Sequence, residues 1–100
     1  MTQTDVKASH LNNSGVIAAF RTRIKGFICT PSITLNTEIV IYDNASAASG
    51  NVLCRFDSGI GTATSNATWT ALVPGEGILA QNGVYVDLGA NGVTLTVFYG

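Results

Sequence analysis

Apolar and polar residues alternate along much of this 100-residue sequence, and this period of two restricts the possible folds more than any other feature. In VTLTVFYG (93–100), valine and leucine alternate with threonine, and in ATWTALV (67–73), alanine, tryptophan and valine alternate with threonine. A period of two places the apolar residues on one face of a β-strand. The i, i+3, i+4, i+7 spacing of an amphipathic helix does not recur along the chain, so we predict an all-β fold.

Turn signals separate the alternating segments at intervals of roughly 8–12 residues, a spacing typical of antiparallel sandwiches and small barrels. EIVIYD (38–43) is apolar at consecutive positions and is predicted to be a central strand. In VLCRFD (52–57), Val52, Cys54 and Phe56 are predicted to share one face. Further strands are expected at 4–10, at GVIAAF (15–20) leading into 21–30 with a bend at Gly26, at 67–73 and at 93–100. We predict a single domain, residues 1–100, folded as an antiparallel β-sandwich that is jelly-roll-like or a small barrel, with about eight short strands.

The segment VPGEGILAQNGVYVDL (73–88) contains the letters G-x-G-x-x-A, which also occur in dinucleotide-binding loops. In such a loop a helix follows the first glycine, and an acidic residue about 20 positions later binds the ribose. Here Asn82-Gly83, a strong hairpin signal, stands where the helix would continue, and no acid lies near position 95. We interpret the segment as a turn at 74–77 and a β-hairpin turn at Asn82-Gly83, and we expect no cofactor.

Charged residues make up only 11% of the chain, against about 25% in an ordinary soluble domain. Five Lys/Arg and six Asp/Glu give a net charge of −1, which argues against a nucleic-acid partner because that affinity comes mostly from cations. No apolar run approaches the ~20 residues of a membrane helix, and the polar segment MTQTDVKASH does not resemble a secretory signal, so we expect no membrane partner. A surface this poor in charge suits a subunit covered by partners in an assembly; a solitary hydroxyl-rich β-domain is the alternative.

Residue types that carry catalysis or metal binding are few and scattered. His10 is the only histidine, and Cys29 and Cys54 lack the spacing of a zinc or redox motif. Glu76 has no second carboxylate at a spacing that would pair with it for acid–base chemistry. We therefore expect no catalytic, cofactor-binding or metal-binding residues and no enzyme activity. The two cysteines are interpreted as buried free thiols, although a disulfide would be open to them if their strands were neighbours.

Three of the five cations, Arg21, Arg23 and Lys25, stand at every second position of a predicted strand and so share one face. One interpretation is that this stripe docks on an acidic surface of a protein partner or of a neighbouring subunit. The other is a solvated face whose cations meet carboxylates on adjacent strands. The carboxylates considered are Glu38, Asp43 and Asp57.

Two further residues are candidates for contact with a partner. Glu76 lies in the 74–77 turn and is expected to be solvated or paired with an arginine of this chain or of a neighbour. Tyr85 lies between Val84 and Val86 on a strand and is expected to face outward, where it could line a sugar platform with Tyr42 or a subunit interface. Catalysis is expected at neither residue.

The C-terminal third of the sequence resembles small virion proteins of tailed bacteriophages, particularly marine ones. The resemblance rests on PGEGILAQNGVYVDL and VTLTVFYG, on the DVKAS segment near the start and on RTRIKG at 21–26. It runs from end to end but is weaker between Cys29 and Thr68. These motifs are turns and strands, so no catalytic residue follows from the resemblance.

This resemblance implies a structural protein of the virion, assembled in the host cytoplasm, such as a capsid decoration or cement subunit. Such a subunit would bind the major capsid protein or another virion protein and stabilise the shell. We also expect a homo-oligomer, for example a trimer, because symmetric contacts suit the low charge. The alternative function is a tail-associated or fibre-tip module that recognises a glycan on the host surface.

Overall fold

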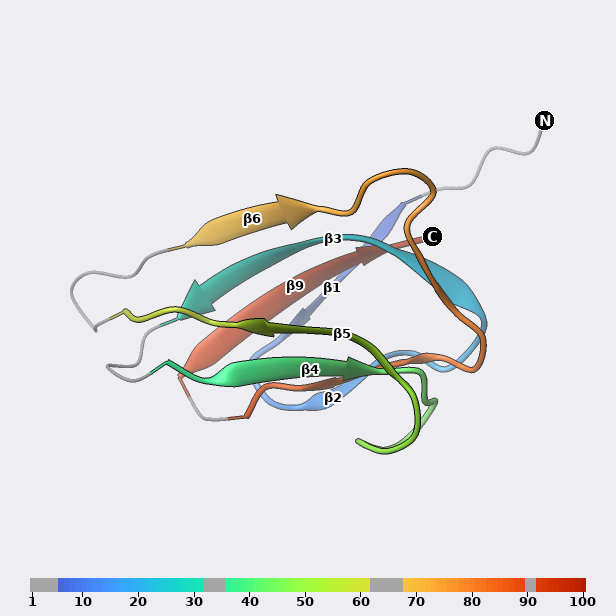
Figure 1. The fold of residues 1–100 in the computed structure, drawn as a ribbon, viewed down its shortest axis with the longest axis horizontal. Coiled ribbons are helices and arrows are strands. Elements are labelled where there is room, and N and C mark those ends of the chain that lie inside the picture. Colours follow the sequence, from blue (N-terminus) through green and yellow to red (C-terminus); the bar gives the residue numbers. More distant parts are fainter. Residues whose placement is uncertain (1–5, 32–35, 62–67, 90–91) are drawn as a thin grey trace.

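The computed structural model describes residues 6–31, 36–61, 68–89 and 92–100. In these residues nine strands form two antiparallel sheets that face one another, so the predicted all-β sandwich is confirmed (Figure 1). The strands are β1 (Lys7–Leu11), β2 (Gly15–Ala18), β3 (Thr22–Pro31), β4 (Glu38–Tyr42), β5 (Val52–Asp57), β6 (Trp69–Leu72), β7 (Ile78–Ala80), β8 (Val84–Asp87) and β9 (Val93–Tyr99). No helix in the described segments has the length and apolar character that crossing a bilayer requires.

The five-stranded sheet has the order β1-β9-β3-β6, and β7 also pairs with β3; the four-stranded sheet has the order β2-β8-β4-β5. The long strand β3 lies in the middle of the first sheet and pairs with β6, β7 and β9. As predicted, β4 is central, because it pairs with both β5 and β8. The predicted bend at Gly26 is confirmed as a register shift between Ile24 and Gly26. A bulge of this kind increases the local twist of a strand.

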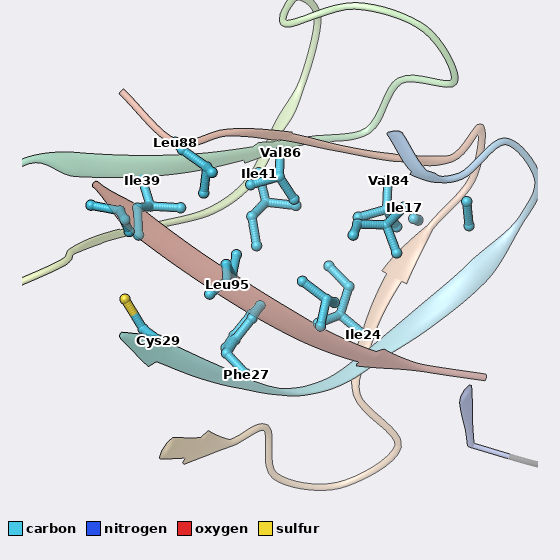
Figure 2. Packing of buried hydrophobic residues seen from close by; sticks show 14 residues of the cluster. Ile17, Ile24, Phe27, Cys29, Ile39, Ile41, Val84, Val86, Leu88 and Leu95 are labelled. Carbon is cyan, nitrogen blue, oxygen red and sulfur yellow. The ribbon is translucent and has the colours of Figure 1, made fainter. Parts of the chain in front are cut away.

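The core lies between the two sheets and is almost entirely aliphatic (Figure 2). In β9, the predicted alternation is confirmed, since Val93, Leu95 and Val97 are fully buried and the threonines between them are not. On β4, Ile39 and Ile41 project from the opposite sheet into the same layer. Each fully buried aliphatic side chain contributes about 1.5–3 kcal/mol. This shared inner layer therefore holds the two sheets together.

Three aromatic rings close one side of the core. Phe27 of β3 contacts Phe56 of β5, with ring centroids 5.1 Å apart, and Phe56 meets Trp69 of β6 edge to face at 5.5 Å. Trp69 also donates its indole N–H to the Ser58 carbonyl oxygen at 2.9 Å. Trp69 packs against the core, which agrees with its place on the apolar face predicted for 67–73. The cluster joins strands of both sheets where β5 and β6 are edge strands.

The expected hairpin at Asn82-Gly83 is wrong. Strand β7 before this turn pairs with β3 of the first sheet, whereas β8 after it pairs with β2 and β4 of the second. The turn carries the chain from one sheet to the other, and the Asp43 carboxylate accepts the Asn82 backbone N–H at 2.8 Å. A Cβ atom at Gly83 would lie 2.6 Å from the Ala18 carbonyl oxygen, so glycine is needed for close packing rather than for a hairpin.

Two other details differ from the predictions. GVIAAF does not simply lead into the next strand: Ala18 ends β2 in one sheet and Thr22 begins β3 in the other, which gives nine strands rather than about eight. Val52 does not share a face with Cys54 and Phe56. The register of β5 shifts between the partners of Ile41 and Tyr42, so Leu53 packs toward the core and Val52 is exposed. A bulge shifts the alternation by one residue, and this reverses every side chain beyond it.

Candidate functional site

A pocket of about 540 Å³ opens on the five-stranded sheet, and it brings together four of the five residues predicted to contact a partner. This volume falls within the ~300–1,000 Å³ range of ligand pockets. The lining residues are Lys7, Phe20, Arg21, Thr22, Arg23, Lys25, Glu76, Leu79, Tyr99 and Gly100. We call this site the cationic pocket. Tyr85, the fifth predicted contact residue, is not among its lining residues.

Strand pairing positions the cations of the pocket. Arg23 and Lys25 alternate along β3 with the buried Ile24 between them, and Arg21 immediately precedes the strand. Lys7, near the start of the chain, lies beside these cations because it is the register partner of Tyr99 on β9, and Tyr99 is in turn the partner of Ile24. The pairing order β1-β9-β3 therefore places cations from distant parts of the sequence beside one another.

The 74–77 turn forms the wall that carries Glu76. Gly77 has a φ of +94°, and a Cβ atom there would overlap the Ile24 carbonyl oxygen, so only glycine lets the turn lie this close to β3. Lys25 then reaches the turn, and its Nζ donates to the Glu76 carbonyl oxygen at 2.9 Å. The Glu76 side chain is exposed, and no described residue pairs with its carboxylate.

The electrostatic balance of the pocket is strongly positive. Four of the five Lys/Arg residues of the chain line it, against the single carboxylate side chain of Glu76, so the side chains of the lining carry an excess of three positive charges. Two of these cations donate to neutral oxygens only: Lys25 to a backbone carbonyl, and Arg21 Nε to the side-chain oxygen of Gln81 at 3.4 Å. These contacts orient the side chains but leave their charge uncompensated.

One part of the alternative interpretation of the cation stripe, the pairing of its cations with carboxylates on adjacent strands, is wrong. Glu38, Asp43 and Asp57 lie on or beside β4 and β5 of the other sheet, not on strands adjacent to β3. Among the described residues the one ion pair joins Arg55 to Glu38 at 3.4 Å, outside the pocket. The three cations of the stripe therefore face a concave surface without carboxylates from neighbouring strands.

Sequence reasoning missed the apolar part of this pocket and one of its cations. Phe20 is 54% exposed at its rim, and Leu79 and Tyr99 line it from β7 and β9. Lys7 stands alone in its segment, so only its pairing across β9 links it to the stripe. Nothing in the sequence pointed to Phe20, because GVIAAF (15–20) was predicted to lead directly into the strand at 21–30.

Tyr85 faces outward on β8, as predicted, and stands on the outer face of the four-stranded sheet. It is the register partner of both Val16 on β2 and Tyr42 on β4, and Tyr42 is in turn the partner of Val52 on β5. These four side chains form a line across all four strands, which we call the apolar row. Tyr85 and Tyr42 are thus neighbours in the sheet, whereas the flanking valines were not anticipated.

The outer face of the five-stranded sheet, beyond the pocket, is rich in hydroxyl groups. Thr30 and Thr94 are register partners, and the Oγ1 of Thr30 lies 2.9 Å from that of Thr68. His10 is exposed, and its Nδ1 lies 2.8 Å from the Thr96 hydroxyl. We call this surface the threonine face; its members are Thr30, Thr68, Thr70, Thr94 and Thr96.

Groups with the chemistry of nucleophiles or metal ligands lie away from the pocket. Cys29 is buried on β3 and Cys54 is half-buried on β5, in different sheets, and both are free thiols. Burial raises the pKa of Cys29 to about 11 and also raises the pKa of Cys54, because a low-dielectric environment disfavours the thiolate. Within the described segments, no group of three or more His, Cys, Asp or Glu side chains could hold a metal ion.

The arrangement is suited to binding anions. Cations of β1 and β3, together with Arg21 just before β3, surround a hollow with an aromatic rim, a geometry that attracts carboxylates or other oxyanions. Glu76 carries the only side-chain carboxylate of the lining. Comparison of the chain with protein-family models, with curated proteins and with solved structures finds no match.

Proposed function

We propose that this chain is a non-enzymatic structural subunit of a tailed-phage particle, a capsid decoration or cement subunit that binds the major capsid protein lattice and stabilises the shell. The observation that carries the proposal is the convergence of four of the five cations in one pocket. A chain with so few charges gathers most of its positive charge where an acidic protein surface can dock. The resemblance to small virion proteins supplies the biological setting.

Electrostatics and surface chemistry support a role in assembly. A cluster of uncompensated cations steers an acidic partner during encounter and fixes its orientation on contact. The threonine face next to the pocket offers hydroxyl and methyl groups, a mixture that fits the semi-polar interfaces of protein assemblies. A standard contact covers ~800 Å² per partner, about a seventh of the 5504 Å² accessible surface of this chain. Several such contacts can therefore form at once.

The chemistry at the pocket supports binding rather than catalysis. Glu76 stands alone as a carboxylate, and acid–base hydrolysis by carboxylates needs two of them. Thr22 is the one hydroxyl side chain of the lining besides Tyr99, and it is buried. No histidine lines the pocket to activate either hydroxyl.

Quantitative mass spectrometry of particles from the virus that encodes the chain tests this proposal. A decoration subunit is expected in hundreds of copies per particle, because it follows the symmetry of the shell. Absence of the chain from purified particles would contradict the proposal altogether. A count between three and a few dozen would place the chain in the tail.

The docking role of the pocket is tested by incorporating variants into particles. Simultaneous Arg21→Glu, Arg23→Glu and Lys25→Glu substitutions are expected to abolish incorporation. A stricter comparison uses Arg23→Glu in the pocket and Arg55→Glu outside it, because both make the same change in net charge. Arg23→Glu should reduce incorporation and Arg55→Glu should not. Full incorporation of the triple variant would show that the pocket is not the docking site.

The second candidate function is a tail-associated or fibre-tip module that recognises a host glycan. The observation that favours it is the adjacency of Tyr42 and Tyr85 in the apolar row, since sugar rings stack on neighbouring aromatic side chains. Binding to a glycan array that is lost in Tyr85→Ala but kept in Arg23→Glu would support this function. Absence of glycan binding together with hundreds of copies per particle would exclude it.

A further inference from the structure

We propose that the cationic pocket is occupied by the acidic corner of a second copy of this chain, so that subunits associate head to tail. The acidic corner consists of Glu38, Asp57 and Asp87 on the four-stranded sheet. This inference rests on the proposed function, because it places a second subunit of the same assembly in the pocket; the contact with the capsid lattice is then made by other surfaces of the associated subunits. Both complementary surfaces are present on the same molecule.

The acidic corner is an unbalanced group of carboxylates. Glu38 at the start of β4 is the register partner of Asp57 at the end of β5, and both side chains are exposed. Like charges directly opposite one another on neighbouring strands are destabilising. Arg55 pairs with Glu38 at 3.4 Å, whereas no described residue donates a hydrogen bond or an ion pair to the Asp57 carboxylate. A cation from outside the chain would relieve this repulsion.

The third carboxylate of the corner extends it to the next strand. Asp87 of β8 is the register partner of Val40, which lies opposite Arg55, so its outer-face position is diagonal to that of Glu38 on the neighbouring strand and is separated from that of Asp57 by β4. Asp87 accepts hydrogen bonds from the Ser14 hydroxyl and the Gly89 N–H but forms no ion pair in the described part of the chain. Three carboxylates against Arg55 leave an excess of two negative charges.

The pocket and the acidic corner lie at opposite ends of the molecule and on different sheets. Strand β3 begins at the pocket with Thr22 and ends at Pro31, and β4 begins with Glu38 at the same end as Pro31 (Figure 1). The ten residues of β3 span about 30 Å at ~3.3 Å per residue, and the longest extent of the molecule is 45 Å. The two groups therefore cannot meet within one chain, but they can meet between chains.

Charge complementarity favours this partner. The pocket carries an excess of three positive charges, the corner carries an excess of two negative ones, and together they contain most of the charged residues of a chain that is otherwise nearly neutral. The Debye length at physiological ionic strength is about 8 Å, so exposed charges attract mainly at close range and the attraction falls with added salt. The contact is thus expected to be specific in geometry and sensitive to salt.

The location of the two surfaces determines the type of assembly. The surfaces differ, so the contact is heterologous, and every subunit that uses its pocket still has a free corner. Such contacts close into a ring if the rotation between neighbours allows it and otherwise form an open row. A trimer, the oligomer expected from the sequence, is one such ring.

Two reciprocal charge-reversed proteins test the inference. The pocket variant carries Arg21→Glu and Arg23→Glu, which leave the Lys25 contact with the 74–77 turn intact; the corner variant carries Glu38→Lys and Asp57→Lys. Association of the full chain is measured by sedimentation velocity and native mass spectrometry at low and high salt. Each variant alone is expected to associate at least about tenfold more weakly than the wild type, because like charges now meet. Mixed at equal concentration, the two should form heterodimers whose affinity is within about threefold of the wild-type pairwise contact, since each reversed surface then meets its complement. The heterodimer is the species compared, because two alternating variants cannot close a ring with an odd number of subunits.

The outcomes separate this inference from the proposed function. Circular dichroism and thermal melting first establish that both variants are folded. A wild type that stays monomeric at high concentration, or a mixture that fails to recover association, overturns the inference. If the pocket variant is then also excluded from particles, the pocket binds another virion protein and the proposed function stands. If the wild type itself is absent from particles, the proposed function fails whatever the self-association.

Discussion

The five-stranded sheet carries four cations at one end and threonines on its outer face, whereas the outer face of the four-stranded sheet carries the apolar row and the acidic corner. Their inner faces hardly differ, because both supply valine, leucine and isoleucine to one core. Both inner faces have to be apolar to pack into one core, whereas packing restricts the composition of the outer faces much less. The two sheets therefore differ mainly in their outer faces, and the shared core holds these faces at fixed relative positions.

The largest expected effect comes from the inner layer. Leu95→Ala removes a fully buried side chain from the centre of β9 and is expected to lower the free energy of unfolding by about 2–5 kcal/mol. Leu72→Ala is the matched control, because the same truncation occurs on an outer face where Leu72 is 80% exposed, and it should change stability by less than ~0.5 kcal/mol. Urea unfolding followed by the fluorescence of Trp69 measures both. Similar losses in the two variants would contradict the contrast between inner and outer faces.

The second prediction concerns the wall of the cationic pocket. In Gly77→Ala the new side chain stands at a positive φ and overlaps the Ile24 carbonyl oxygen. We expect the free energy of unfolding to fall by about 1–3 kcal/mol and the Glu76 turn to move away from Lys25. Gly75 in the same turn also has a positive φ, but a Cβ atom there would meet no atom within 4 Å, so Gly75→Ala should lower the free energy of unfolding by less. Thermal melting compares the two. An equal or larger loss for Gly75→Ala would show that close approach to β3 does not position the turn.

The third prediction uses pH to probe the core. Burial raises the pKa of Cys29 from an ordinary value near 9 to about 11 in the folded protein. Between these values the unfolded chain releases the thiol proton while the folded chain keeps it, so stability falls as pH rises from about 9 to about 11. Below pH 9 the effect is absent, because the thiol is protonated in both states.

Melting temperatures of the wild type and of Cys29→Ala across this range measure the contribution of the thiol. The variant is expected to be less stable at every pH but to show a shallower decline above pH 9. The other ionisable groups are the same in both proteins, so the difference between the curves isolates Cys29. Parallel curves would contradict a buried thiol as the source.

The smallest effect is expected on the outer face of the four-stranded sheet. Arg55→Gln breaks the ion pair with Glu38, whose two side chains are 59% and 52% exposed, and should change stability by no more than ~0.5 kcal/mol. The substitution also makes the acidic corner more negative, so head-to-tail association should become slightly tighter. Urea unfolding and sedimentation velocity check the two effects. A stability loss above ~1 kcal/mol would show that this pair is more than a solvated contact.

The sequence predicted some elements of the fold correctly and misplaced others. The alternation in β9 and the apolar run of β4 identified two central strands correctly, because burial on one or both faces leaves a direct trace in the residue order. Asn82-Gly83 was correctly identified as a turn but wrongly assigned to a hairpin. The local rule describes how the backbone reverses, and it contains no information on which sheet receives the next strand. Val52 was misplaced for a similar reason, because a bulge leaves no mark in the alternation before it.

The candidate site was predicted in part. Arg21, Arg23 and Lys25 were recognised from their spacing on one strand, and Glu76 from its turn. Lys7 was not recognised, because it joins them only through the pairing of β1 with β9 and of β9 with β3. The acidic corner escaped notice for the same reason: Glu38 and Asp57 are far apart in the sequence but directly opposite in the sheet.

The sequence by itself determined that this chain forms strands, which of their faces are apolar and where most of the turns lie, since these properties depend on residues a few positions apart. Only the tertiary structure decided which strands share a sheet, and with it that four cations line one pocket while three carboxylates gather at the far end. Strand pairing joins residues of any separation in the sequence, and the partner is chosen by the packing of the whole core. The packing of the buried core residues therefore determines where the charged residues lie on the surface.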